Sequence, residues 1–249
     1  MTALILALIA GAVVGLALGA LGGGGSVLAV PALIYLLGFT PTAATTASLI
    51  IVTVTSLTAL YAHARAGQVR WKAGAAFAAA GTLPAAAAGA AAVHMPQAVL
   101  TIAFAAIAVL AAIKMLRPAD TARPGSGDVR PGKAAGSGAG LGTLTGLLGV
   151  GGGFLAVPAL VTVLGFEMEA AVGTSLLVIT ANSLASLATR SGAASSLDWA
   201  VIGPFIGTAI LGAWDGKRMA AKVSGPRLQR IFAAVLLAVA AFMLADAVM

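Results

Sequence analysis

Two glycine runs contain the residues whose types and spacing could do chemistry in this chain. Gly22–Gly25 are followed by Ser26, and a second run, Gly151–Gly153, lies further along. Each run interrupts an apolar segment, which then resumes as an apolar helix. Glycine tolerates a left-handed backbone, so such a run can leave the helix. The first amides of the resuming helix then lack intrahelical partners and lie at the positive end of its dipole, which favours an anion.

Hydroxyl and amide side chains supply further hydrogen-bond donors within two apolar segments, 42–62 and 168–189. We expect Ser48, Ser175 or Asn182 to contact a bound substrate, with Asn182 the most polar group in mid-segment. Some hydroxyls of these segments will instead bond back to carbonyls of their own helix. The histidines His63 and His94 lie at segment ends and are interpreted as interfacial side chains rather than proton carriers.

The glycines also have a purely structural interpretation. Gly11, Gly15 and Gly19 follow the small-xxx-small spacing that lets membrane helices pack closely, and packing is our expectation for them. Four glycines in a row do not follow helical spacing, so the runs are read either as an anion-coordinating break or as a structural turn. A nucleotide-binding loop is disfavoured, because no Lys-Ser/Thr pair follows the glycines.

Composition indicates that a bilayer surrounds these segments. The 249 residues are 60% hydrophobic and 8% charged, with a mean hydropathy of +1.06, whereas soluble domains carry about 25% charged residues. There is no cysteine, and no residue pattern indicates a metal or another cofactor. The net charge of +7 does not indicate nucleic-acid binding, since the basic residues cluster at the ends of apolar segments. A membrane enzyme is disfavoured for want of a clustered nucleophile and base.

An internal repeat organises the chain. Shifted by 127 residues, 11–60 and 138–187 share 25 of 50 positions without a gap, including "LAVPAL" twice in register. We therefore divide the chain into a first membrane repeat (1–117), a linker (118–133) and a second repeat (134–249). The apolar segments of the two repeats are 2–21, 27–38, 42–62, 73–93 and 97–116, then 134–148, 154–165, 168–189, 198–214 and 229–248.

The distribution of lysine and arginine predicts the topology. Thirteen of the 14 basic residues lie in or beside three loops, those around 65–72, 114–133 and 217–230, which are expected to face the cytoplasm. The repeats are then inverted relative to each other, and both termini are external. The expected fold is all-α and polytopic, each repeat having a glycine-broken helix pair, which crosses twice or forms a re-entrant hairpin, and three spanning helices. Inverted repeats are a recurring architecture of secondary transporters, with the substrate near the midplane.

The motifs "GALGGGGSVLAVPAL" and "GLLGVGGGFLAVPAL", with "AATTASL" and "AAVGTSL" after them, resemble the TauE/SafE family of membrane permeases over essentially the whole chain. The resemblance implies transport of sulfite, sulfonates or related organosulfur anions across the bacterial cytoplasmic membrane, usually outward. One departure is Ala47, where the family commonly has threonine; Thr174 keeps that residue in the second repeat.

The sequence therefore predicts a permease that moves small anions by alternating access, with no cofactor. The alternatives are an anion channel and a non-transporting membrane assembly subunit. The oligomeric state is not indicated. The candidate substrate-binding residues are Gly22, Gly23, Gly24, Gly25, Ser26, Ser48, Gly151, Gly152, Gly153, Thr174, Ser175 and Asn182.

Overall fold

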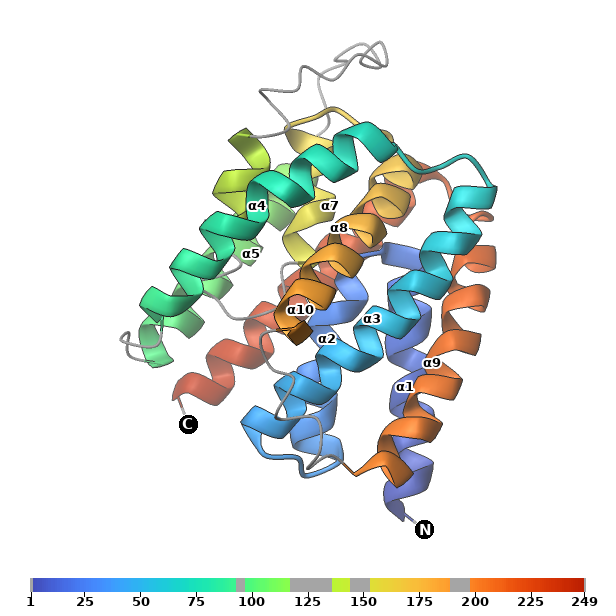
Figure 1. Ribbon diagram of the computed structural model, residues 1–249, viewed down its shortest axis with the longest axis vertical. Helices are drawn as coiled ribbons and strands as arrows, with labels where there is room; N and C mark the ends of the chain where they lie inside the picture. The colour runs from blue at the N-terminus through green and yellow to red at the C-terminus, as the bar shows by residue number, and fades with distance from the viewer. Residues whose placement is uncertain (1, 93–96, 117–135, 144–152, 189–197, 249) are drawn as a thin grey trace.

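The computed structural model describes residues 2–92, 97–116, 136–143, 153–188 and 198–248 as helices joined by short turns, with no strand in these ranges (Figure 1). This confirms the all-α expectation. A stretch at 136–143 is also helical. The named elements are α1 (Thr2–Leu21), α2 (Gly24–Pro31), the π-helix η1 (Ala32–Leu36), α3 (Pro41–Arg65), α4 (Trp71–Ala92), α5 (Gln97–Leu116), α7 (Gly153–Thr162), α8 (Met168–Ala188), α9 (Trp199–Ala220) and α10 (Gly225–Val248).

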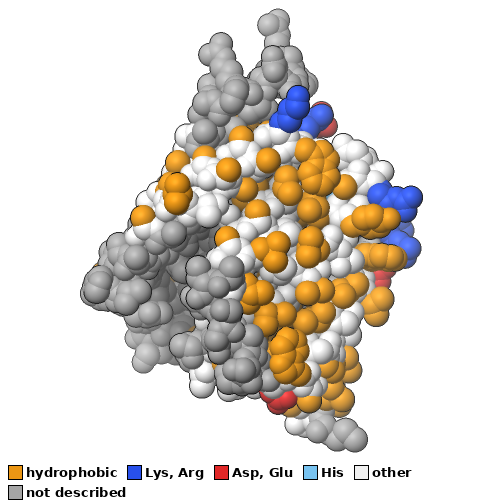
Figure 2. All heavy atoms as spheres, viewed as in Figure 1, with side chains coloured by type: hydrophobic (Ala, Val, Ile, Leu, Met, Phe, Trp, Pro, Cys, Tyr) orange, Lys and Arg blue, Asp and Glu red, His pale blue; other side chains and the backbone are white. Residues whose placement is uncertain are grey.

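Four of the described helices are long and apolar enough to cross a bilayer, namely α1, α3, α8 and α10. Large apolar side chains remain on the outside, as Ile5, Ile9 and Val13 of α1 do. Figure 2 shows hydrophobic side chains spread over the visible face, with lysine and arginine gathered toward its upper part. An apolar exterior of this extent suits contact with lipid chains.

The first glycine run joins α1 and α2 into a hairpin. Gly22 has a φ of +63°, the left-handed conformation that favours glycine, and its amide donates to the carbonyl of Leu18 at 2.9 Å. Helix α2 begins at Gly24, three residues before the predicted start, and Gly25 packs directly on the Leu18 backbone. The chain therefore reverses within the glycine run itself.

The two prolines of the repeated "LAVPAL" motif lie inside helices and not in first turns. Pro31 is the last residue of α2, after which the chain continues as the π-helix η1. Pro158 lies within α7. Because proline lacks an amide hydrogen, it cannot make the regular helical bond, and a widened turn is one way to accommodate that loss. Neither proline therefore begins a helix.

Helices α1 and α9 form a seam of small residues. A Cβ added to Gly15 would lie 2.0 Å from the Ala209 carbonyl oxygen, and one added to Gly19 would lie 2.0 Å from that of Ala213. The contacts advance in the same direction along both helices, so α1 and α9 run parallel. The expected packing role of this spacing is confirmed.

The second repeat makes the matching contact. A Cβ on Gly138 would lie 2.4 Å from the Phe77 carbonyl oxygen, and one on Gly142 would lie 2.1 Å from that of Gly81, both in α4. Thus the first segment of each repeat packs on the fourth segment of the other.

Helices α3 and α8 cross at the centre and run antiparallel. Ser56 Oγ lies 2.9 Å from Thr180 Oγ1 in mid-helix. Beyond the end of α3, Gln68 Nε2 donates to Glu169 Oε2 in the first turn of α8 at 3.0 Å. Lys217, near the end of α9, reaches the Ala62 carbonyl, so the α3–α4 and α9–α10 loops share one end of the molecule. Both chain termini lie toward the opposite end in Figure 1.

Candidate functional site

The Gly22 turn brings several predicted site residues together. A Cβ on Gly22 would lie 2.4 Å from Ser175 Oγ and 3.1 Å from the Val172 carbonyl oxygen. The first repeat's glycine run therefore contacts the second repeat's α8. Val172 is only four residues into α8, about 6 Å at 1.5 Å per residue, so the turn lies near the N-terminal end of α8. Helix α1, which precedes the turn, is a full 20-residue helix.

The hydrogen bonds around the turn show which groups are already engaged. The Gly25 amide donates to the Gly22 carbonyl at 3.2 Å, and the Ser26 amide to the Gly23 carbonyl at 3.3 Å. Ser26 Oγ also donates to Gly23 at 2.7 Å. Gly23 is the N-cap residue of α2, and Gly24 is its first residue.

The serine and threonine candidates in α3 and α8 are buried and mostly bonded within their own segment. Ser175 Oγ donates to the Val172 carbonyl at 2.8 Å, and Ser48 Oγ to that of Thr45 at 2.8 Å. Thr174 Oγ1 accepts a bond from the Arg70 amide at 3.1 Å and so ties the α3–α4 loop to α8. Such local bonds are the structural role that the sequence also allowed for hydroxyls.

The remaining candidates lie apart from the turn. Ser48 is in the second turn of α3, at the opposite end of the molecule from Gly22, and Asn182 is seven residues beyond Ser175 on α8. Among the described residues, the Asn182 Oδ1 atom is buried without a hydrogen-bond partner. Gly151 and Gly152 lie outside the described residues, and Gly153 is the first residue of α7.

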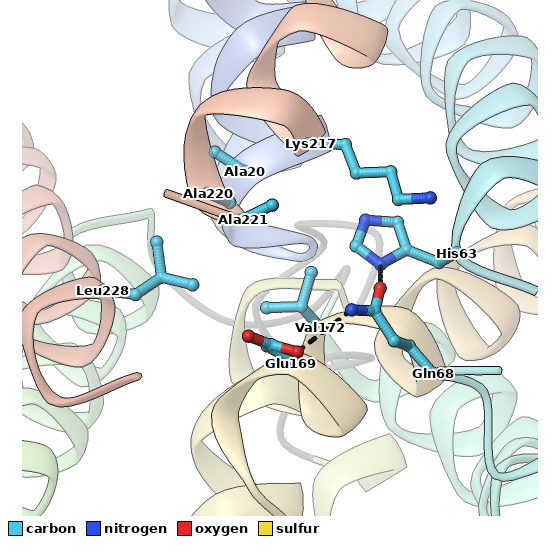
Figure 3. Close-up of a pocket in the computed structure, with 9 residues that line it drawn as sticks. All are labelled: Ala20, His63, Gln68, Glu169, Val172, Lys217, Ala220, Ala221 and Leu228. Atoms are coloured by element: carbon cyan, nitrogen blue, oxygen red, sulfur yellow. Dashed lines mark hydrogen bonds between the residues drawn. The ribbon is translucent and has the colours of Figure 1, made fainter. Parts of the chain in front are cut away.

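A second polar cluster, which the sequence reasoning missed, lies beside the turn (Figure 3). His63 is only 3% exposed, so it is not a solvated interfacial side chain. Its Nδ1 lies 2.8 Å from Gln68 Oε1 and its Nε2 lies 3.3 Å from the Gly19 carbonyl oxygen. Glu169 and Lys217 complete the His63 cluster, which borders a cavity of about 20 Å³. That space has room for about one water molecule and not for an oxyanion.

One sequence signal could have located this cluster. The charge pattern places the segment end that holds His63 and the short loop before Glu169 on the same side of the membrane, so the two were candidates for contact. The side chain of Glu169 is exposed, although it is bonded to Gln68. Within the described ranges, no three His, Cys, Asp or Glu residues lie close enough to hold a metal ion.

These features define a multi-pass helical membrane protein, and comparison with known proteins gives its family and its class, a membrane transporter. Residues 7–243 match the family described as Sulfite exporter TauE/SafE. The chain therefore belongs to the TauE/SafE family. It is 34% identical to a "Probable membrane transporter protein" of Xylella fastidiosa strain Temecula1, and 33% identical to a protein of the same name from strain 9a5c; each alignment covers 97% of this chain and 95% of the relative. No solved structure matches the chain.

Proposed function

We propose that this transporter moves small oxyanions such as sulfite, sulfonates or related organosulfur anions outward across the bacterial cytoplasmic membrane. The observation that carries the proposal is the Gly22 turn packed against Ser175, with the Gly23 and Gly24 amides at the start of α2. These amides and the helix dipole offer an anion two donors and a favourable field without a cationic side chain. Ser26, Ser175 and Thr174 supply the surrounding hydroxyls.

The second half of the site is proposed from the repeat. Gly149 and Ser48 are the repeat counterparts of Gly22 and Ser175. We propose that the glycines of the second run and Ser48 serve the second repeat as Gly22–Gly25 and Ser175 serve the first, and that Asn182 also contacts the anion. The amide of Asn182 can present either its oxygen or its NH₂ group, and the latter suits an anion.

Alternating access follows from the exchanged contacts between the repeats. Segment one of each repeat packs on segment four of the other, and α3 and α8 cross antiparallel. Two halves related in this inverted way give states of similar energy that open to opposite sides. We place the basic loops 65–72 and 217–230 in the cytoplasm and both termini outside.

The test is anion flux in proteoliposomes, comparing Gly22→Ala with Gly38→Ala. Both glycines have a left-handed backbone, with φ of +63° and +69°, so both substitutions carry the same strain of about 1–2 kcal/mol. A Cβ on Gly38 has no atom within 4 Å, whereas one on Gly22 collides with Ser175. We expect Gly22→Ala to lower sulfite flux about tenfold, which is about 1.4 kcal/mol, and Gly38→Ala to leave it within about twofold of the unmodified protein.

The outcomes separate the alternatives. Equal flux in the two variants would remove the anion site from the Gly22 turn. Currents far above carrier rates would identify an anion channel, and an absence of flux for every anion tested would favour a non-transporting assembly subunit.

A further inference from the structure

The His63 cluster joins four parts of the chain at one end of the molecule. His63 belongs to α3, Gln68 to the following loop, Glu169 to α8 and Lys217 to α9, and the carbonyl of Gly19 in α1 faces the imidazole. Figure 3 shows the side chains of His63, Gln68 and Glu169 in line, with Lys217 beside the ring. The anion site proposed above uses none of these four side chains.

The orientation of the Gln68 amide is determined by its neighbour on α8. A carboxylate only accepts hydrogen bonds, so the NH₂ group of Gln68 must face Glu169, as the 3.0 Å bond from Nε2 to Oε2 has it. The Gln68 oxygen then faces His63 Nδ1 at 2.8 Å. Because a carbonyl oxygen accepts, Nδ1 must be the donor of this bond.

The other ring nitrogen must also donate. His63 Nε2 faces the Gly19 carbonyl oxygen at 3.3 Å, and a backbone carbonyl again only accepts. A neutral imidazole carries one N–H and can satisfy only one of the two contacts. Both are satisfied at once only by the doubly protonated imidazolium.

We propose that His63 is a proton-binding site, occupied in the conformation described here, and that anion movement by this transporter is coupled to proton release from it. The coupling rests on the function proposed above; the proton site does not. With the proton bound, the imidazolium links α1 through Gly19 to α8 through Gln68 and Glu169. Without it, one of the two links is lost, and this end of the molecule is freed to open.

Protonation of the ring itself determines the sign of the pH dependence, and the surroundings of the ring determine how strongly the proton is held. Burial and Lys217 on α9 oppose the imidazolium, whereas the Gly19 carbonyl, Gln68 and Glu169 on α8 favour it. Helix α1 contains no titratable side chain, α10 contributes Leu228, and Arg65 on α3 lies against Tyr61. Low pH therefore favours the linked conformation, and high pH favours its opening.

The direct test is nitrogen NMR of the ¹⁵N-histidine-labelled full chain in lipid nanodiscs. His94, the chain's other histidine, is replaced by asparagine so that His63 gives the only imidazole signals. We expect both ring nitrogens to be protonated at the acidic end of the range pH 5–8 and the ring to become neutral as the pH rises. A neutral ring throughout pH 5–8 would overturn the proton site, whether or not the protein transports anions.

A matched pair of variants tests the link to α8. Glu169→Gln lets the Gln68 amide turn over and donate to a neutral His63, so we expect the imidazolium fraction at pH 7 to fall about tenfold, the change that one pH unit produces. Glu167→Gln removes the same charge two residues earlier, and no side-chain contact joins Glu167 to the His63 cluster in the described ranges; we expect less than a twofold change. Equal changes in the imidazolium fraction for the two variants would mean that only the loss of a negative charge nearby matters. The proposed link from His63 through Gln68 to Glu169 would then fail.

Measurements of anion flux test the proton coupling separately from the anion transport that it presupposes. In proteoliposomes, His63→Gln should retain anion flux down an anion gradient while losing at least about tenfold of the flux driven by a pH gradient alone. Retention of the pH-driven flux would refute the coupling. If the unmodified protein moves no anion although His63 titrates, the function proposed above fails and the proton site stands.

Discussion

The α1–α9 seam and the α3–α8 crossing both join one repeat to the other, yet they consist of different side chains. Along α1 and α9, glycine and alanine bring backbone against backbone, as Gly15 does against Ala209. Where α3 and α8 cross, the hydroxyl of Ser56 faces that of Thr180, and each also has a carbonyl of its own helix within reach as an acceptor. The first contact cannot slide without collisions between main chains. The second can lose the bond between the two hydroxyls, because each hydroxyl can donate its single hydrogen to its own helix instead.

This difference divides the molecule into a rigid part and a part that can move. We expect α1 and α9 to travel together in any change of conformation, and α3 and α8 to slide or tilt. The Gly22 turn and the His63 cluster both lie where these two parts meet.

The largest expected effect comes from filling the seam. Gly15→Ala places a Cβ 2.0 Å from the Ala209 carbonyl oxygen, so we expect a loss of about 3 kcal/mol in the free energy of unfolding. The same substitution at Gly207 of α9, which is exposed with open space around it, should stabilise by up to about 1 kcal/mol, because alanine favours helix. Thermal unfolding in detergent measures both. Similar destabilisation by the two variants would contradict a tightly packed seam.

A smaller effect is expected at the crossing. Ser56→Ala and Thr180→Ala each remove one side of the 2.9 Å bond, and each should cost about 1 kcal/mol. The double variant should cost less than the sum of the two, since the shared bond is lost only once. Strict additivity in this cycle would show that the two hydroxyls do not interact.

The smallest effect is expected at the exposed edge of α9. Asp215 and Arg218 form an ion pair at 3.5 Å with side chains 65% and 75% exposed. Asp215→Asn should change the unfolding temperature by less than about 1 °C, since exposed pairs contribute little. A change in unfolding temperature as large as the one that Ser56→Ala causes would mean that this ion pair helps to hold the rigid part formed by α1 and α9.

Much of the architecture was predictable because it depends on local patterns. Apolar length predicted the helices, and the spacing of Gly11, Gly15 and Gly19 predicted a close contact, although not that α9 is the partner. The structure of the glycine run was harder to predict, because its residues have different roles. Gly22 makes the turn and Gly25 allows α2 to lie on α1, whereas anion binding by Gly23 and Gly24 stays a prediction.

The His63 cluster could not be predicted from composition, because burial there depends on tertiary contacts. His63 lies at the end of an apolar segment, where an interfacial histidine is expected, and the approach of α1, α8 and α9 covers it. The midplane position expected for the substrate stays a prediction. What the structure adds is that α1 runs for 20 residues before the chain reverses at Gly22.

The α1–α9 seam also has a consequence for synthesis of the chain. Trp199, the first residue of α9, emerges from the ribosome 178 residues after Leu21, the last residue of α1 (199 − 21). At about 5–20 residues per second, α1 waits roughly 10–40 s in the membrane before its partner is made. Its glycine face must be covered during that time by lipid or by the insertion machinery, so the first half of this protein cannot finish folding on its own.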